Sequence, residues 1–190
     1  MVNPHHARQR ATSRDSGNAE LIVSGFAATA ATHAALGHPE RAADLLAEVD
    51  TTPGTRDNTY YPAWLNRMVR TALDLDRPDM AQRLLAGVEP HHPYTEHALA
   101  AAHAAITEHL GDHRTAADAY TQATTGWEHF GVVPEHPYAL LGHGRSLLAI
   151  GRPTDAEVLQ HARNLFDQLH ATPTLTEIDT HLQRANAPHH

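Results

Sequence analysis

The 190-residue sequence contains no cysteine and no lysine, since all 14 of its basic residues are arginine. The absence of cysteine excludes disulfides, thiolate metal ligands and a cysteine nucleophile. The absence of lysine excludes Schiff-base chemistry and the lysine of a phosphate-binding loop. Aromatic residues make up only 5% of the chain, and long β-branched runs are missing. The core must therefore be aliphatic and rich in alanine, which disfavours a β-sandwich or barrel and suits closely packed helices.

Charge and hydrophobicity narrow the range of partners and locations. The formal net charge of −8 argues against a nucleic-acid surface, because such a surface needs a basic face. No apolar run approaches the ~20 residues that cross a bilayer, and residues 1–17 lack the apolar segment of a secretory signal. We therefore expect no nucleic-acid or membrane partner, a cytoplasmic location and a disordered leader at residues 1–17. The 18 histidines are interpreted as the mark of a GC-rich gene.

Four stretches share one pattern, in which a helix stops abruptly and a second helix begins. They read LGHPERA, LDRPDMA, LGDHRTA and IGRPTDA, and they start at Leu36, Leu75, Leu110 and Ile150. A glycine without a Cβ favours a left-handed helix C-cap, and it stands at Gly37, Gly111 and Gly151. Asp76 replaces it in the second stretch. Proline costs nothing in a first helical turn, where we expect Pro39, Pro78 and Pro153.

Small or modest residues recur at fixed positions in both helices of each pair. In the first helix they stand seven positions before the cap residue, at Ala30, Val69, Ala104 and Gly144. In the second helix they stand five positions after it, at Ala42, Ala81, Ala116 and Ala156. Such positions allow two helix axes to approach closely. Neither helix can bury its apolar stripe alone, so stacked pairs would create one continuous core.

We therefore predict an all-α fold, a right-handed superhelical stack of antiparallel helix pairs closed by a C-terminal capping helix. The expected helices cover residues 19–36, 40–49, 59–75, 78–88, 94–110, 113–130, 137–150, 153–169 and 175–185. The repeat domain would extend over residues 18–186, with about four pairs plus the cap, and a tail would follow at 187–190. The linkers between pairs, PHHP among them, are expected to be turns within one solenoid.

These positions give the chain a resemblance to the tetratricopeptide-repeat family. The family combines a small residue in the first helix, glycine at the turn, alanine early in the second helix and a large apolar residue four positions later. In the first copy these are Ala30, Gly37, Ala42 and Leu46. The large apolar residue recurs as Leu85 and Tyr120, but Gln160 takes its place in the last copy. That copy keeps a helical apolar stripe at Leu159, Ala162, Leu165, Phe166 and Leu169. The spacings of 39, 35 and 40 residues exceed the usual ~34, which longer linkers explain.

The segment from Trp127 to Ala185 is also similar to the C-terminal end of large bacterial signalling proteins. These include multidomain ATPase-type transcription regulators and some adenylate or guanylate cyclases. The resemblance implies a sensor or scaffold region in signalling or transcriptional regulation. The chain has no GxxxxGK[ST] motif, no cyclase catalytic segment and no recognisable DNA-binding helix pair. We therefore expect a non-catalytic module without a cofactor that binds a protein or peptide, and exposed end faces of the stack could drive self-association.

The first helices of successive pairs line a concave surface in repeat proteins, and partners usually bind there. Register with the repeat predicts seven residues on this surface: Asn66, Arg70, Asp74, Glu108, His109, Tyr138 and Arg145. Arg70 and Arg145 would hold a peptide carboxylate through two hydrogen bonds each. The alternative is that both arginines are solvated charges that pair with Asp74 or Glu108.

A second candidate site is a metal site in the stretch EPHHPYTEH. Its imidazole and carboxylate groups are reasonable zinc ligands, and the candidates are His91, His92, Glu96 and His97. No histidine pair there has the spacing of an HExxH helix, and loop histidines beside proline are usually solvated. A metal-dependent or metal-responsive protein therefore stays an alternative. A repeat domain that senses a small effector in the groove is another.

Two further motifs have structural interpretations. The stretch GHGRS superficially resembles a phosphate loop, but it lies inside a predicted helix and lacks lysine. We interpret its Gly144 as a position of close helix packing. The cluster of Glu108, His109, Asp112 and His113 brackets a helix stop, where hydrogen bonds that cap a helix are the expected role.

Overall fold

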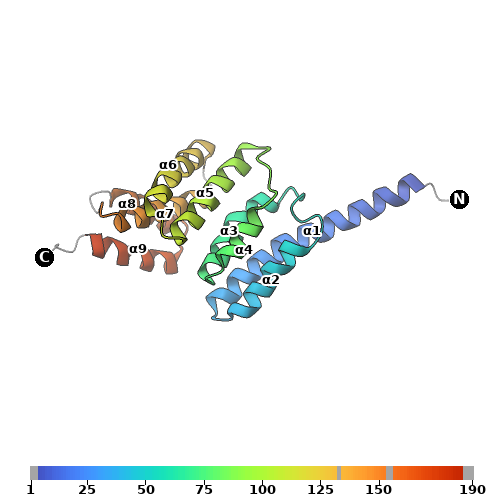
Figure 1. Ribbon diagram of the computed structural model, residues 1–190, viewed down its shortest axis with the longest axis horizontal. Helices are drawn as coiled ribbons and strands as arrows, with labels where there is room; N and C mark the ends of the chain where they lie inside the picture. The colour runs from blue at the N-terminus through green and yellow to red at the C-terminus, as the bar shows by residue number, and fades with distance from the viewer. Residues whose placement is uncertain (1–3, 132–133, 153–155, 186–190) are drawn as a thin grey trace. The chain divides into compact units, whose positions relative to one another are not determined.

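Helices make up most of the described chain (Figure 1). The computed structural model describes the backbone of residues 4–131, 134–152 and 156–185, with side chains from Ala19 onward. The nine helices of this described part are α1 (Pro4–Ala35), α2 (Pro39–Thr51), α3 (Tyr61–Asp74), α4 (Pro78–Leu85), α5 (Pro93–His109), α6 (His113–Phe130), α7 (Glu135–Ala149), α8 (Glu157–Gln168) and α9 (Thr172–Ala185). The all-α prediction is confirmed. None of the described helices combines the length and the apolar character that a bilayer span needs.

The chain divides into two compact units, residues 1–90 and 91–190. The boundary falls between Pro90 and His91, inside the linker PHHP. The sequence predicts one repeat domain over residues 18–186, with this linker as an internal turn. Each unit has its own set of fully buried apolar side chains, such as Val23 and Leu65 in the first and Trp127 and Leu159 in the second.

The first unit contains two antiparallel helix pairs. α1 packs along both α2 and α3, and α3 packs against α4. α1 begins at Pro4, so the helix includes residues 4–17, which we expected to form a disordered leader. No proline occurs between Pro4 and Pro39, and an interior glycine costs only about 1 kcal/mol relative to alanine. Nothing in this stretch therefore stops a helix.

The second unit contains five helices that pack in chain order, each antiparallel to the one before it (Figure 1). α5 also contacts α7, and α7 also contacts α9. α5 and α7, the first helices of two successive pairs, are therefore neighbours in this unit. α9 lies next to α7 in the same way. A core cluster joins α7, α8 and α9 through Leu140, Leu141, Leu159, Ala162, Phe166 and Ile178.

Each pair passes from its first to its second helix through the same backbone turn. The cap residue has a positive φ of 75° at Gly37, 56° at Asp76, 87° at Gly111 and 76° at Gly151. At Asp76 the two hydrogen bonds of a Schellman motif close the turn, from Arg77 N to Ala72 O at 2.9 Å and from Asp76 N to Leu73 O at 2.9 Å. The cap prediction is confirmed, including the position where aspartate replaces glycine. His170, with φ 55°, makes a similar turn between α8 and α9 that the sequence does not predict.

The second helices begin largely as their sequences predict. Pro39 and Pro78 are the first residues of α2 and α4. At the start of α6 the Asp112 carboxylate accepts a hydrogen bond of 3.1 Å from Thr115 N, which confirms its capping role. Pro153 lies outside the described residues, and α8 begins at Glu157.

The small residues of the repeat are buried with one exception, Ala156, which is half-buried and lies just before α8. The residues of this set with no exposed surface are Ala30, Ala42, Val69, Ala81, Ala104 and Ala116. Gly144 is also buried, and a Cβ on it would lie 2.4 Å from Leu159 Cδ2 on α8. Real Cβ atoms do not approach carbon so closely, so the interpretation of Gly144 as a close-packing position is confirmed.

Two helix ends differ from the prediction. Leu169, which we expected on the buried stripe of α8, is 49% exposed, because α8 ends at Gln168 and the chain turns at His170. α4 ends at Leu85 instead of residue 88. The reason is Gly87, whose φ of 78° lies in the left-handed region and ends the helical path.

Candidate functional site

A ladder of charged side chains joins α5, α7 and α9 in the second unit. Arg145 of α7 donates from Nε to Glu108 Oε1 at 2.7 Å and from Nη2 to Glu108 Oε2 at 3.0 Å. Its Nη1 donates to Glu177 Oε1 of α9 at 2.9 Å. The Tyr120 hydroxyl of α6 donates to Glu108 Oε2 at 2.7 Å. We call these four residues the Arg145 ladder.

The ladder runs from a buried end to an exposed end. The side chain of Glu108 is 12% exposed, that of Arg145 35% and that of Glu177 44%. Glu108 accepts hydrogen bonds on both carboxylate oxygens, so it fixes the plane of the guanidinium from the inside. Glu177 meets the guanidinium at its outer edge, where His181 Nε2 also lies 3.8 Å from Glu177 Oε1.

The contacts of the ladder shift two pKa values. Burial alone lowers the pKa of the Arg145 guanidinium, but its hydrogen bonds to Glu108 and the surrounding charges together outweigh burial, and the net pKa is raised. Arg145 is therefore permanently charged. The pKa of Glu177 is lowered, first by the nearby imidazole of His181. Burial opposes this effect, and the charge and hydrogen bond of Arg145 add to the lowering. Arg145 and Glu177 are thus both ionised at neutral pH.

Glycines in the stretch GHGRS make room for the ladder. A Cβ on Gly142 would lie 2.3 Å from the Tyr120 hydroxyl oxygen, so only glycine lets the phenol ring reach across α7 toward Glu108. Gly144 does the same for Leu159 on the side of α8. Arg145 follows directly and contacts Glu108 of α5 and Glu177 of α9. The segment therefore positions three side chains by close packing and an ion pair.

The structure brings together two of the seven residues predicted for the groove, Glu108 and Arg145. Their pairing matches the alternative in which Arg145 pairs with Glu108. Tyr138 of α7 packs its ring edge-to-face on Phe166, with centroids 4.8 Å apart, and His109 is exposed at the end of α5. These four residues belong to the second unit.

The other three predicted groove residues lie on α3 in the first unit. Asn66 is buried, with 3% of its surface exposed, so its side chain does not present an open binding surface. Arg70 is half-buried and Asp74 is exposed. The role predicted for these three residues stays a prediction.

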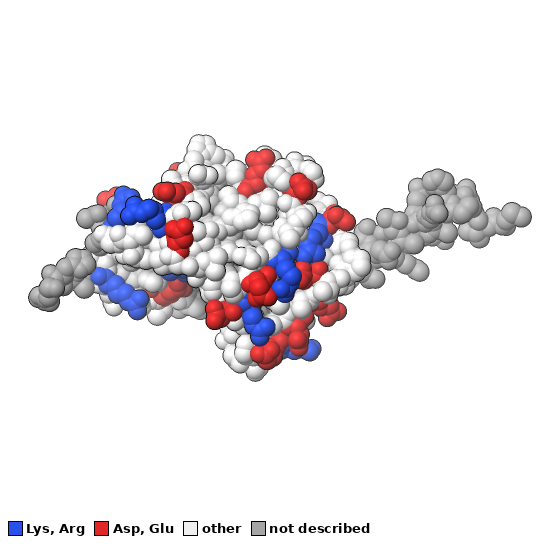
Figure 2. Space-filling model, viewed as in Figure 1, with Lys and Arg blue, Asp and Glu red and all other residues white. Residues whose placement is uncertain are grey.

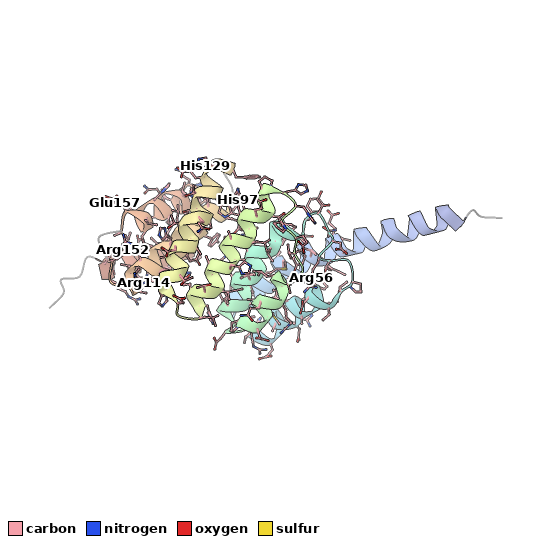
Figure 3. The ribbon with its side chains drawn as sticks, turned by 45° about the horizontal axis from the view of Figure 1, so that its top comes forward. Arg56, His97, Arg114, His129, Arg152 and Glu157 are labelled. Atoms are coloured by element: carbon pink, nitrogen blue, oxygen red, sulfur yellow. The ribbon has the colours of Figure 1, made fainter. Side chains whose placement is uncertain are left out.

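The four residues of the metal candidate do not converge. His91, His92 and Glu96 are exposed, whereas the His97 ring packs edge-on against Trp127 and Phe130 with centroids 5.5 and 6.1 Å apart. His97 on α5 lies at the end of α6 that carries His129 (Figure 3). Within the described residues, no group of three or more His, Asp or Glu side chains is arranged to hold a metal ion.

A second charged cluster, in the first unit, was not predicted. Asp50 of α2 is 10% exposed and accepts a hydrogen bond of 3.0 Å from Arg83 Nε. Arg56 pairs with the same carboxylate and donates to the carbonyl oxygens of Asp50 at 2.8 Å and Arg83 at 2.9 Å. The cluster therefore ties the loop after α2 to α4, which is a structural role. On the face seen in Figure 2, arginines likewise lie next to acidic side chains.

Sequence reasoning also missed Glu177 and the hydroxyl of Tyr120. Register with the repeat identified Tyr120 only as a large apolar residue, which its burial at 3% exposure confirms. Glu177 lies on a helix that we expected only to cap the stack. Its distance from Arg145 along the chain leaves no sequence signal for the pair.

No family model matches the chain. The search of curated proteins finds no match to its sequence either.

Proposed function

We propose that the chain is a non-catalytic protein-interaction module with the right-handed superhelical stack of a tetratricopeptide-like repeat. The recurrence of one left-handed cap in all four helix pairs supports this. The burial of the small residues at matching positions supports it as well. In such repeats the first helices of the pairs provide the binding surface.

The observation that carries the binding proposal is the outer edge of Arg145. Glu108 already fixes the guanidinium by two hydrogen bonds from the buried side, so its Nη1 edge is pre-oriented toward the exposed side. A pre-oriented guanidinium binds carboxylates well, because little side-chain entropy is lost on binding. The contact of Nη1 with Glu177 at 2.9 Å is the geometry that a carboxylate of the partner would adopt. The partner is therefore an acidic peptide or protein segment.

The resemblance of residues 127–185 to large signalling proteins suggests the setting. We place the module in bacterial signalling or transcriptional regulation, in the cytoplasm, as a scaffold that recruits an acidic partner. Exposed end faces of such a stack would also allow self-association.

Selection from a random peptide library displayed on phage tests the proposal. We expect the full chain to enrich peptides that contain aspartate or glutamate, and we expect the Arg145→Gln chain to bind these peptides at least tenfold more weakly. Arg114→Gln is the matched control, because Arg114 is an exposed arginine at the start of α6 (Figure 3). Peptides without acidic residues, or equal affinity for the native and Arg145→Gln chains, would refute the proposal.

A further inference from the structure

We propose that α9 is a displaceable latch, in which Glu177 occupies the place on Arg145 that the carboxylate of the partner would take. This inference rests on the proposed function and adds its regulation and the chemistry of the ligand. The partner would be a helical segment that carries an apolar residue between two acidic ones, as Ile178 stands between Glu177 and Asp179.

Few buried apolar side chains attach α9 to the rest of the second unit. Ile178 is its one buried residue among those described, and Ala171, Leu175 and Leu182 pack against the core cluster only in part. α7, in contrast, buries nine of its residues. Helices with few buried side chains open locally without global unfolding. Among the described helices of the second unit, α9 therefore buries the fewest apolar side chains.

The charged contacts of α9 lie on both sides of Ile178. Glu177 accepts from Arg145 of α7 at 2.9 Å, and Asp179 accepts from Arg163 Nε of α8 at 2.7 Å. Both carboxylates are 44% exposed and both arginines are 35% exposed, so water reaches the two ion pairs and a competing carboxylate can reach the guanidinium groups. The two acidic residues thus pair with two arginines, and the isoleucine between them packs into the core cluster.

The site remains intact when α9 leaves. Arg145 keeps its two hydrogen bonds to Glu108, and Glu108 keeps that of Tyr120. None of these three groups belongs to α9. The guanidinium therefore stays oriented toward the vacated position, ready for a segment of the same chemistry.

The test uses the helix itself as the probe. A fluorescently labelled peptide with the sequence of residues 171–185 is titrated against the full native chain and against a full chain with Glu177→Gln and Asp179→Asn. The peptide keeps both carboxylates, whereas the helix in the double variant has lost them. A third chain adds Arg145→Gln to the double variant. Far-UV circular dichroism establishes that all chains are folded. The single variant Glu177→Gln, which removes only one of the two carboxylates, is measured as well.

We expect the peptide to bind the double variant roughly threefold or more tightly than the native chain, because the tethered helix competes less well without its ion pairs. The Glu177→Gln chain should fall between them, and adding Arg145→Gln should abolish the gain. Equal affinity for all chains, or no binding to the double variant, would overturn the latch. If the α9 peptide binds as expected but the library selection enriches no acidic peptides, the latch stands and the proposed partner class is wrong.

Discussion

The Tyr61 hydroxyl of α3 donates a hydrogen bond of 2.8 Å to the carbonyl oxygen of Leu84 near the end of α4. The ring has no exposed surface. Burial raises the pKa of Tyr61, an effect that Arg56 partly opposes and Asp50 reinforces. The neutral phenol is therefore the form that the folded state holds.

This contact predicts a loss of stability in alkali. A raised folded-state pKa means that the contribution of Tyr61 is fully present below its unfolded pKa of ~10 and is lost as pH rises above it. We expect the native chain to lose stability progressively as pH rises above about 10, and Tyr61→Phe to lose less over the same range. At neutral pH, Tyr61→Phe should cost about 1–2 kcal/mol, because the Leu84 carbonyl loses its partner. Urea unfolding followed by circular dichroism measures both effects.

The neighbouring Tyr60 is the control for this prediction. Its side chain is exposed, so Tyr60→Phe should keep both the native stability at neutral pH and the native alkaline loss. An unchanged pH dependence in Tyr61→Phe would show that the buried phenol is not the titrating group.

A methyl group on Gly144 should destabilise the second unit. Its Cβ would lie 2.4 Å from both Cδ2 and Cγ of Leu159, a fully buried side chain, so Leu159 would have to shift. We expect Gly144→Ala to cost about 1–3 kcal/mol through overpacking, more than it gains in helix propensity. Gly25 of α1 is exposed, and a Cβ added there would have no other atom within 4 Å, so Gly25→Ala should stabilise by roughly 0.5–1 kcal/mol. Two substitutions of equal effect in urea unfolding would argue against close packing at Gly144.

The two carboxylates on Arg83 should differ in importance. Asp50 is 10% exposed and also holds Arg56, whereas Asp79 is 70% exposed and bonds Arg83 at 2.8 Å from within the same helix. Asp50→Ala should cost about 2 kcal/mol, because two arginines lose a shielded partner. Asp79→Ala should cost clearly less than Asp50→Ala, because Asp79 is exposed to solvent and loses only its pair with Arg83 and its favourable place in the first turn of α4. Thermal unfolding of both variants gives the comparison, and a larger loss in Asp79→Ala would contradict it.

Removing the charge of Glu108 should weaken the ladder from its buried end. Glu108→Gln leaves Arg145 with one anionic partner, Glu177, and should cost about 2 kcal/mol. Glu96→Gln, an exposed change in the first turn of the same helix α5, is the matched control and should cost clearly less, because it loses only a favourable interaction with the helix N-terminus. Urea unfolding that shows no difference between the two variants would mean that the Glu108–Arg145 pair contributes nothing net.

Local sequence signals predicted the helices and their turns well. Glycine at Gly37 and proline at Pro39 act on their own backbone, so the cap and the helix start follow from two neighbouring residues. Asp76 shows the same logic, since its place in the repeat predicted a left-handed residue despite its side chain. The burial of Ala30 and Ala42 follows from periodicity for the same reason.

Only part of the candidate site could be predicted from the sequence, because the residues that contact one another in it are far apart along the chain. Register placed Glu108 and Arg145 on equivalent helices, and these two do meet. Glu177 reaches Arg145 through the turn at His170, where no glycine marks the left-handed cap. His97 shows the opposite case, in which a metal-like sequence places an imidazole against the ring of Trp127. In both cases tertiary packing decides what the side chain contacts.

Hydrogen exchange of the full chain, read by mass spectrometry, tests the central claim most directly. The claim is that α9 covers Arg145 as a separable latch. We expect the amides of α9 around Ile178 to exchange faster than those of α7 around Leu141, and Glu177→Gln to speed α9 further while α7 stays unchanged. Equal exchange in α9 and α7, with the same response of both to Glu177→Gln, would show that α9 is a fixed part of the fold and would contradict the account.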